Sequence, residues 1–377
     1  MKTILKHARL LSVAFLLWSG STMAYAQDKI DVQNWSELIA EAQIEAQLVG
    51  VGGVVFKDGE LIETAVAGEK QLGSELKIEP NERWHIGSIT KPVTATMIAR
   101  LVEQGTLSWD DSVEDILGTK KIHKQWRGVT FRELLTHTSG AKANFSVWTN
   151  LFQPKTPEKT LESRKKNVRK MLRKKPKSEP GTAHVYSNVG FTIAAHLAEV
   201  KTGKSWETLM REEVFEPLEL TSAGFGPPKP VDGNPVAWGH RGETAMDPSG
   251  LADNSPMMGP AGNLHMTLQD LAKFGQAHVD GVAGRSDYLS QETFAILHAP
   301  RLEDYAMGWM HPEKSLFSDT PMFWHNGSNK MWYALLIAAP EDNMVYALVT
   351  NSGKIQAADR AFAGIIKTHY NSAIEVE

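Results

Sequence analysis

Apolar segments of strand length near both ends of the chain constrain its fold more than any other feature. Residues 51–66 (VGGVVFKDGELIETAV) hold two β-rich segments on either side of Asp58-Gly59, a dipeptide typical of a tight hairpin turn. Residues 331–340 (MWYALLIAAP) and 344–350 (MVYALVT) are two further apolar runs, separated by a short polar connection. Because these two runs do not alternate between apolar and polar residues, we expect strands that are covered on both faces.

Helical patterns flank these strands and fill the long segment between them. We expect helices at about residues 35–48 and 357–370, and a mainly helical middle at about residues 92–281. This order predicts an α/β (α+β) fold, in which one antiparallel sheet is built from both chain ends, flanked by helices and interrupted by a helical insertion. The α/β part would consist of residues 27–91 and about 282–377.

The first 26 residues have the three parts of a secretory signal peptide. The start is basic, residues 10–18 (LLSVAFLLW) are apolar, and Ala24-Tyr25-Ala26 is a small-x-small cleavage site. The apolar run is too short to cross a membrane, since a spanning helix needs about 20 residues. We therefore expect a secreted or periplasmic protein without a membrane span, cleaved between Ala26 and Gln27.

The composition excludes several kinds of site and partner. The 377 residues include no cysteine, which rules out a thiol nucleophile, a disulfide scaffold and a metal site with Cys ligands. The formal net charge is −4, whereas nucleic-acid-binding proteins are normally strongly basic, so no nucleic-acid partner is expected. The 13 histidines show no HExxH or comparable spacing, so we expect no metal and no cofactor.

Residues 164–177 (RKKNVRKMLRKKPK) form a strongly basic segment without an acidic residue. One interpretation is that this basic helix, from Arg164 to Lys177, makes weak contact with anionic polymers or lipid headgroups of the cell envelope. The other is the solvated face of a helix, with Val168, Met171 and Leu172 turned inward. We favour the second, because charge runs are commonly solvent-facing.

The pattern Ser-x-x-Lys occurs four times, at Ser74/Lys77, Ser88/Lys91, Ser139/Lys142 and Ser163/Lys166. In the first turn of a helix, residues i and i+3 share a face, so the amine lies beside the hydroxyl and eases its deprotonation. Only Ser88 lies where a strand-like segment (WHIG) meets a long apolar helix pattern with Pro92 in its first turn. The helix N-terminus there favours a developing anion, which makes Ser88 the candidate nucleophile.

Two further motifs carry possible chemistry. Tyr186-Ser187-Asn188 places a phenol at a loop-to-helix junction. A phenol whose pKa is lowered by neighbouring cations can act as a general base, and the alternative is a tyrosine that tethers a loop. His325-Asn326-Gly327-Ser328 leads directly into the apolar run at Met331, where a backbone amide can complete an oxyanion hole, whereas Lys201-Thr202-Gly203 ends a helix pattern.

In this order and context, the three motifs resemble those of the serine β-lactamase and penicillin-binding-protein superfamily, in its class C-like branch. The similarity extends over nearly the whole mature chain, in stretches such as residues 129–140 (VTFRELLTHTSG) and 259–274 (GPAGNLHMTLQDLAKF). The resemblance implies an antiparallel sheet from both termini, an inserted all-helical domain and a site in the cleft between them.

The resemblance also implies roles for individual residues. Ser88 would be the acylated nucleophile, Lys91 its activating amine and Tyr186 the general base. The substrate would be bound by Asn188, by the backbone N–H groups of Ser88 and Ser328, and by the third motif, residues His325, Asn326 and Gly327. No metal takes part in this chemistry.

The third motif departs from the β-lactamases of this branch, which carry Lys where this chain has His325 and usually Thr where it has Asn326. A histidine is mostly neutral near pH 7 and so suits a substrate carboxylate less well than lysine does. His at this position resembles D,D-peptidases and D-amino-acid peptidases of the branch. The prediction is an exported serine hydrolase that cleaves an amide or ester bond of a small-molecule or peptide substrate, D,D-peptidase-, D-aminopeptidase- or β-lactamase-like. A carboxylesterase and a non-catalytic envelope peptide-binding protein are the alternatives.

Overall fold

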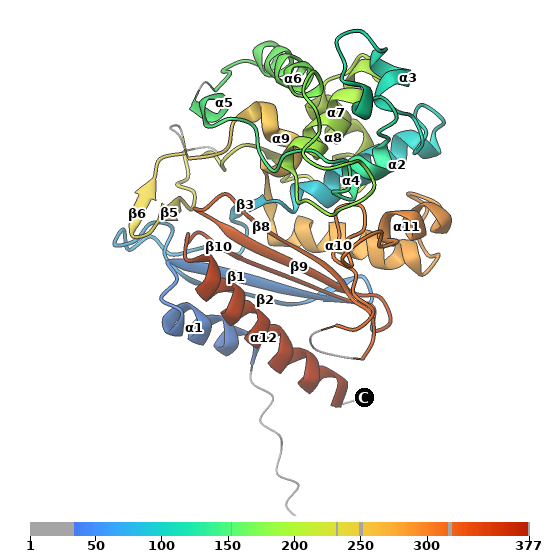
Figure 1. Ribbon diagram of the computed structural model, residues 1–377. Coiled ribbons are helices and arrows are strands. Elements are labelled where there is room, and N and C mark those ends of the chain that lie inside the picture. The colour runs from blue at the N-terminus through green and yellow to red at the C-terminus, as the bar shows by residue number, and fades with distance from the viewer. Residues whose placement is uncertain (1–33, 152, 231–232, 249–251, 316–318, 376–377) are drawn as a thin grey trace, which may run out of the picture. The chain divides into compact units, whose positions relative to one another are not determined.

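The computed structural model describes residues 34–151, 153–230, 233–248, 252–315 and 319–375 (Figure 1). The predicted signal peptide and its cleavage site lie outside the described residues. The helices are α1 (Trp35–Glu45), α2 (Thr90–Glu103), α3 (Val113–Leu117), α4 (Phe131–Leu135), α5 (Val147–Leu151), α6 (Pro157–Leu172), α7 (Asn188–Thr202), α8 (Trp206–Met210), α9 (Gly259–Gly262), α10 (Leu268–Val282), α11 (Gln291–His298) and α12 (Ile355–Glu375). The strands are β1 (Gly50–Lys57), β2 (Glu60–Gly68), β3 (Arg83–Gly87), β4 (Gly224–Phe225), β5 (Gly239–Arg241), β6 (Thr244–Met246), β7 (Leu264–Thr267), β8 (Phe323–Ser328), β9 (Tyr333–Ala339) and β10 (Met344–Thr350). In this part of the chain, each helix is too short or too polar to cross a bilayer.

Strands from both ends of the sequence form the main sheet. Its order is β2-β1-β10-β9-β8, and each neighbouring pair is antiparallel (Figure 1). The predicted hairpin turn is confirmed, because Asp58 and Gly59 join β1 to β2 with positive φ angles of 56° and 81°. The mixed fold class with an antiparallel sheet from both termini is confirmed as well.

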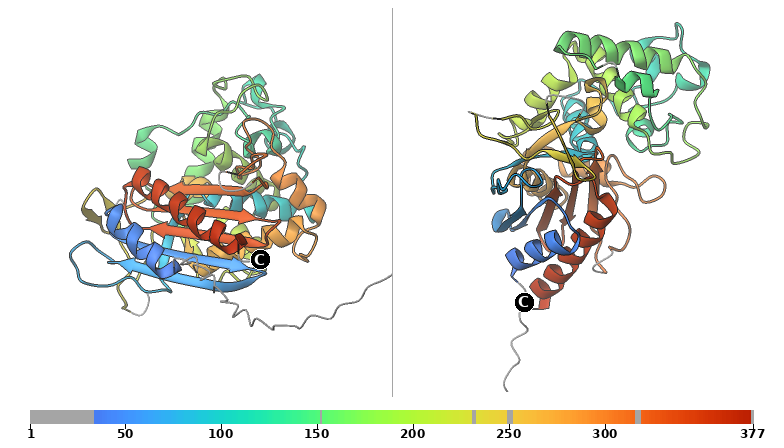
Figure 2. Two further views of the ribbon diagram at one scale, coloured as in Figure 1. Left: turned by 90° about the horizontal axis from the view of Figure 1, so that it is seen from below. Right: turned by 90° about the vertical axis from the view of Figure 1, so that its left-hand side faces the viewer.

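Strands β9 and β10, which correspond to the two apolar runs, are buried on both faces of this sheet. In β9, Leu335 and Ile337 pack in the core beneath α1 and α12, while Leu336 and Ala338 pack in the core on the opposite face. Figure 2 shows α1 and α12 lying together across one face of the sheet. Helix α10 covers the other face, against β1, β9 and β10. The apolar runs therefore lack alternating polar residues because helices cover both faces of the sheet, as predicted.

The segment between β3 and β8 is mainly helical, with α7 packed against α2, α4, α6 and α9. Two small sheets, β3-β7-β4 and β5-β6, also occur; β3 contains the segment WHIG that was expected to be strand-like, whereas β4, β5, β6 and β7 were not predicted. Most of their strands have four residues or fewer, which is too short for a period of two to be recognised. The domain boundaries near residues 92 and 281 stay a prediction, and α10, on the helical side of the second boundary, packs against the main sheet.

The basic segment forms most of α6 and the turn that follows it. Val168 and Leu172 are buried as expected, whereas Lys165, Lys166 and other cationic residues are exposed. Arg164 is an exception to the expected solvated face, because its guanidinium is fully buried. It pairs with Glu199 and with Glu207 (Nη2–Oε1 2.6 Å) and donates from Nε to the carbonyl of Met257 at 3.0 Å.

Two glycines allow the sheets to approach closely where the candidate motifs meet. A Cβ on Gly327 would collide with the carbonyl of Ile86 and lie 2.7 Å from the backbone nitrogen of Ser88. Gly87 has a φ of 51°, and a Cβ there would collide with the backbone nitrogen of Ser328. The end of β8 can therefore lie directly against the junction of β3 and α2.

Candidate active site

Ser88 lies between the end of β3 and the start of α2, and Lys91 lies one helical turn further on. Lys91 Nζ is 3.0 Å from Ser88 Oγ and donates to the carbonyl of Ala261 at 2.7 Å. The lysine is fully buried, and no described carboxylate forms an ion pair with it. Burial therefore lowers the pKa of Lys91 well below its ordinary value of 10.5. Burial thus favours the neutral form of an amine that lies within hydrogen-bonding distance of the serine hydroxyl.

Tyr186 lies immediately before α7 and faces the same pair. Its ring centre is 4.6 Å from Lys91 Nζ, and its hydroxyl is hydrogen bonded with the side chain of Ser88. The residue as a whole is 39% exposed, but its hydroxyl is buried in the cleft.

The pKa of Tyr186 does not shift in the expected direction. We expected neighbouring cations to lower it, but burial raises it to about 12 and the hydrogen bond with Ser88 offsets this only in part. The reason is the burial of the phenol itself, and burial also disfavours the charge of the neighbouring Lys91 amine. Near neutral pH, Tyr186 is therefore a protonated phenol, and burial favours the proton-accepting form of Lys91.

Asn188, Gly327 and Ser328 also meet at Ser88. Asn188 and Ser328 line the same cavity as the serine, and Asn188 Nδ2 donates to Asn144 Oδ1 at 2.7 Å. The close contact of Gly327 with Ser88 puts the backbone nitrogens of Ser88 and Ser328 at one edge of that cavity. Two N–H groups beside a nucleophile are the arrangement that an oxyanion hole requires.

The structure does not bring His325 or Asn326 to this cavity. His325 is buried, and its Nδ1 is hydrogen bonded to the carbonyl of Asn326. Because a carbonyl can only accept a hydrogen bond, Nδ1 is the donor. In the neutral ring, Nε2 then accepts from the Tyr305 hydroxyl at 3.2 Å. Burial lowers the pKa of His325 to about 3, so the ring is neutral. Asn326 points to the other face of the sheet, where its Nδ2 donates to the Tyr333 hydroxyl at 3.3 Å.

Two cationic residues that sequence reasoning missed line the cavity instead. The cavity has a volume of about 450 Å³, and Arg241 and Lys330 contribute to its wall together with Ser88. Arg241 ends β5 and Lys330 lies in the turn between β8 and β9; both are exposed, and neither forms an ion pair with a described residue. Lys330 could have been suspected from its place two residues after Ser328. Arg241 carries no signal in the sequence, because only the fold brings it to the serine.

The buried carboxylate of Asp253 also lines this cavity. Asp253 accepts hydrogen bonds from Asn263 Nδ2 at 2.9 Å and Asn329 Nδ2 at 3.2 Å, and its Oδ1 lies 3.0 Å from His85 Nε2. Asn329 Oδ1 in turn accepts from the backbone of Met331 at 3.1 Å. This network fixes the turn that carries Lys330, although none of its members belongs to a predicted motif.

Known proteins resemble this chain over most of its length. The penicillin-binding protein 4 of Amycolatopsis lactamdurans is 29% identical over 337 residues, which cover 86% of each chain. An unguisins hydrolase of Aspergillus campestris is 24% identical over 358 residues, covering 90% of this chain and 64% of its own length.

Solved structures share the fold. The octameric penicillin-binding protein homologue from Pyrococcus abyssi has a TM-score of 0.72 at 24% identity, over 89% of this chain and 77% of that one. The D-amino acid amidase from Ochrobactrum anthropi SV3 has a TM-score of 0.74 at 19% identity, over 90% and 98%. The model of the protein family described as Beta-lactamase matches residues 35–369, nearly all of the described chain. The chain therefore belongs to the Beta-lactamase family of hydrolases, as its three motifs had indicated.

Proposed function

We propose that this protein is a serine hydrolase that cleaves an amide or ester bond through an acyl-Ser88 intermediate. The observation that carries this proposal is the buried amine of Lys91, 3.0 Å from Ser88 Oγ and without a carboxylate partner among the described residues. A protein that only binds peptides has no need of a buried amine without a carboxylate partner beside a hydroxyl, because keeping a lysine buried and unpaired opposes folding.

In the proposed acylation step, Ser88 Oγ attacks the substrate carbonyl carbon while Lys91 takes the hydroxyl proton. The negative charge on the carbonyl oxygen is received by the N–H groups of Ser88 and Ser328, and one such donor is typically worth about 3 kcal/mol. Tyr186 then gives its proton to the leaving group and recovers one from Lys91. Water releases the acyl group by the same proton transfers in reverse.

The two cations in the cavity support a substrate that carries a carboxylate near the scissile bond. Arg241 offers a planar fork of N–H donors and Lys330 a mobile ammonium group, both suited to carboxylates. They would supply the charge that the neutral His325 does not. The names of the relatives, a penicillin-binding protein and a D-amino acid amidase, support a peptide or amide of a D-amino acid as the substrate class.

A labelling experiment with a kinetic panel tests this function. A fluorescent fluorophosphonate should label the wild-type protein and not Ser88→Ala, with both folded by circular dichroism. Turnover of a D-Ala-D-Ala peptide, a D-amino-acid amide, nitrocefin and a short-chain p-nitrophenyl ester then separates peptidase, amidase, β-lactamase and esterase activity. A wild-type protein that takes no label and turns over none of the four would instead be the peptide-binding alternative.

We further propose that the protein is exported after cleavage between Ala26 and Gln27. The support is the basic start, short apolar run and small-x-small site of the first 26 residues. N-terminal sequencing of the protein recovered outside the cytoplasm of a bacterial host should begin at Gln27. Recovery of the intact N-terminus, in the cytoplasm, would contradict the proposal.

A further inference from the structure

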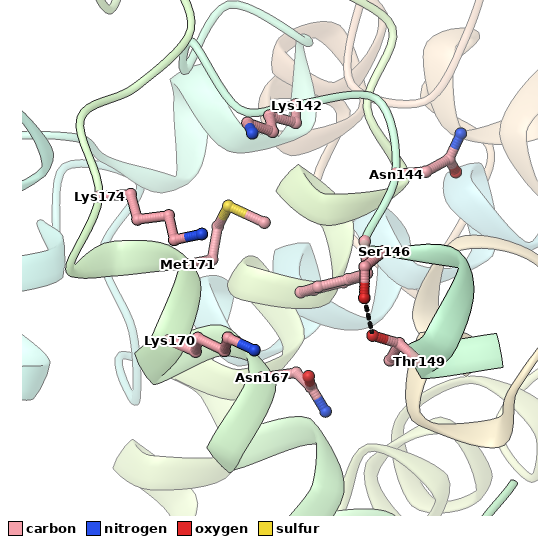
Figure 3. A pocket seen from close by; sticks show the side chains of 9 residues that line it. Lys142, Asn144, Ser146, Thr149, Asn167, Lys170, Met171 and Lys174 are labelled. Atoms are coloured by element: carbon pink, nitrogen blue, oxygen red, sulfur yellow. Dashed lines mark hydrogen bonds between the residues drawn. The ribbon is translucent and has the colours of Figure 1, made fainter. Parts of the chain in front are cut away.

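Three lysine side chains from two separate segments of the chain line one cavity next to the catalytic cleft (Figure 3). Lys142 comes from the connection between α4 and α5, Lys170 from α6 and Lys174 from the turn that follows α6. The cavity has a volume of about 270 Å³. Its other lining residues are polar or apolar but uncharged: Asn144, Phe145, Ser146, Thr149, Asn167 and Met171.

The helix is built so that one of its faces forms this wall. Asn167, Lys170 and Met171 are spaced at i, i+3 and i+4 in α6, positions that share a face of a helix, and Lys174 follows in the turn after the helix. Lys142 reaches the same cavity from outside the basic segment. All three lysines are exposed, as Lys165 and Lys166 are, but only Lys142, Lys170 and Lys174 line this cavity.

The three ammonium groups have no anionic partner among the described residues. None forms an ion pair, and no carboxylate lines the cavity, whereas Arg164 on the same helix is held by two glutamates. Like charges around one cavity repel each other, and an anion placed among them relieves that repulsion. Because the whole chain has a formal net charge of −4, attraction of an anion to this place is local and not a general property of the protein.

A short segment connects this cavity to the catalytic cleft. Asn144 and Phe145 line both cavities, so the two share a wall. Ser187 Oγ donates to the carbonyl of Lys142 at 2.6 Å, and the backbone N–H of Asn188 donates to that of Ala143 at 2.9 Å. The lysine cavity is therefore fastened to the residues that follow Tyr186, and a substrate that extends past Asn144 would reach it.

We propose that the three-lysine cavity is a subsite for a carboxylate of an extended substrate, an acidic peptide whose scissile bond lies at Ser88. This inference rests on the proposed hydrolase function, and it adds that acidic side chains or ends remote from the scissile bond improve binding. Docking of the basic helix on an anionic membrane would be a different property, which needs the exposed lysines of α6 and makes no use of Lys142.

Equilibrium binding tests the subsite without any catalysis. Two dye-labelled peptides that differ only in D-Glu-D-Glu against D-Gln-D-Gln are titrated by fluorescence anisotropy into Ser88→Ala protein. We expect the acidic peptide to bind about tenfold more tightly, the size of a few partly screened ion pairs, with the preference weakening as salt is added. Lys170→Gln/Lys174→Gln should abolish this preference, and so should Lys142→Gln in large part.

The matched control is Lys165→Gln/Lys166→Gln, which removes the same charge from exposed positions of α6 outside the cavity. This variant should keep the preference. An equal loss in both double variants would show diffuse attraction and overturn the proposal, as would the absence of any preference in the parent protein. If both variants also lose binding to vesicles containing an anionic phospholipid, the basic helix is a membrane-docking surface instead.

A second measurement links the subsite to Ser88. Two fluorophosphonate probes with linkers of equal length, one ending in a carboxylate and one in a carboxamide, are compared by their rates of labelling. The carboxylate probe should react several-fold faster in the wild type and in the Lys165→Gln/Lys166→Gln control, and at the same rate as the amide in Lys170→Gln/Lys174→Gln. Labelling by the amide probe alone tests the hydrolase function, so the two proposals can fail separately.

Discussion

Lys91 and Arg164 are both fully buried cationic residues, yet the chain uses them in opposite ways. Arg164 lies in the helical region between Glu199 and Glu207, and although burial disfavours its charge, the two carboxylates raise its pKa above the ordinary value. Lys91 lies at the catalytic serine with only a hydroxyl and a carbonyl as polar contacts, and burial lowers its pKa. Both residues are buried, so the difference comes from their partners: carboxylates raise the pKa of Arg164, and their absence leaves the pKa of Lys91 lowered.

This difference distinguishes a buried cation that stabilises the fold from one that is suited to proton transfer. A buried charge with carboxylate partners is fixed and holds elements together, here α6, α7 and α8. A buried amine without such partners is ready to accept a proton, at the expense of stability. Changing the partners or the cation at each place should therefore affect different measurable quantities.

The largest expected effect is on catalysis at Lys91. Lys91→Met removes the amine and keeps a side chain of similar length, so kcat/KM should fall roughly 10³-fold, within the range for loss of a general base. The free energy of unfolding should stay equal or rise, because an unpaired buried amine is replaced by an apolar group. Activity within a few-fold of the wild type would show that another group accepts the Ser88 proton.

The next effect is on stability at Arg164. Arg164→Met leaves the buried carboxylate of Glu199 without its cation and should lower the free energy of unfolding by about 3 kcal/mol, measured by urea denaturation. The double variant Arg164→Met/Glu199→Gln should recover much of the loss, because it removes the uncompensated charge. If the double variant is as unstable as the single one, lost packing and not the charge explains the effect.

Tyr186→Phe should give a smaller catalytic loss than Lys91→Met. If the phenol delivers a proton to the leaving group, kcat should fall about 10²-fold for a substrate with a poor leaving group such as an amide. For a p-nitrophenyl ester, whose leaving group needs no proton, the loss should be much smaller. Equal losses for both substrates would assign Tyr186 to the attack step instead.

The smallest effect is on the pH dependence of stability. Since the pKa of Lys91 is lowered from 10.5 in the folded state, the unfolded chain binds more protons there between the two values, and stability rises with pH in that window. Relative to Lys91→Met, the wild type should lose stability as the pH falls below 10.5 and level off below the lowered pKa. Parallel unfolding curves at all pH values would show that Lys91 is charged when folded.

Four of the five strands of the main sheet could be predicted because their sequence signals are local, whereas the edge strand β8, which carries the third motif, was not predicted as a strand. The Asp58-Gly59 turn and the unbroken apolar runs of β9 and β10 each depend on neighbouring residues only. The strands β4, β5 and β6 escaped prediction because their two or three residues carry no period. Tertiary pairing alone defines them.

The motifs predicted which residues lie near Ser88. They were less informative about the orientation and protonation of those residues. Gly327 and Ser328 were found through a four-residue motif. The same motif did not reveal that the alternation of side chains along β8 turns Asn326 to the other face of the sheet, or that His325 is hydrogen bonded to Tyr305. The protonation of Lys91 and Tyr186 depends on burial by segments far away in the sequence. Arg241 and Lys330 were missed for the same reason.

The pairing of β1 with β10 sets the order in which the protein can become active. During synthesis, the hairpin of β1 and β2 and then Ser88 are made early, but β8, β9 and β10 follow only near the end of the chain. Until they arrive, β1 has an unpaired edge and Ser88 lacks the backbone of Ser328 beside it. If Ser88 is the nucleophile as proposed, an incomplete nascent chain would carry it without the second oxyanion-hole donor, and acylation would have to wait until the strands at the end of the chain are in place.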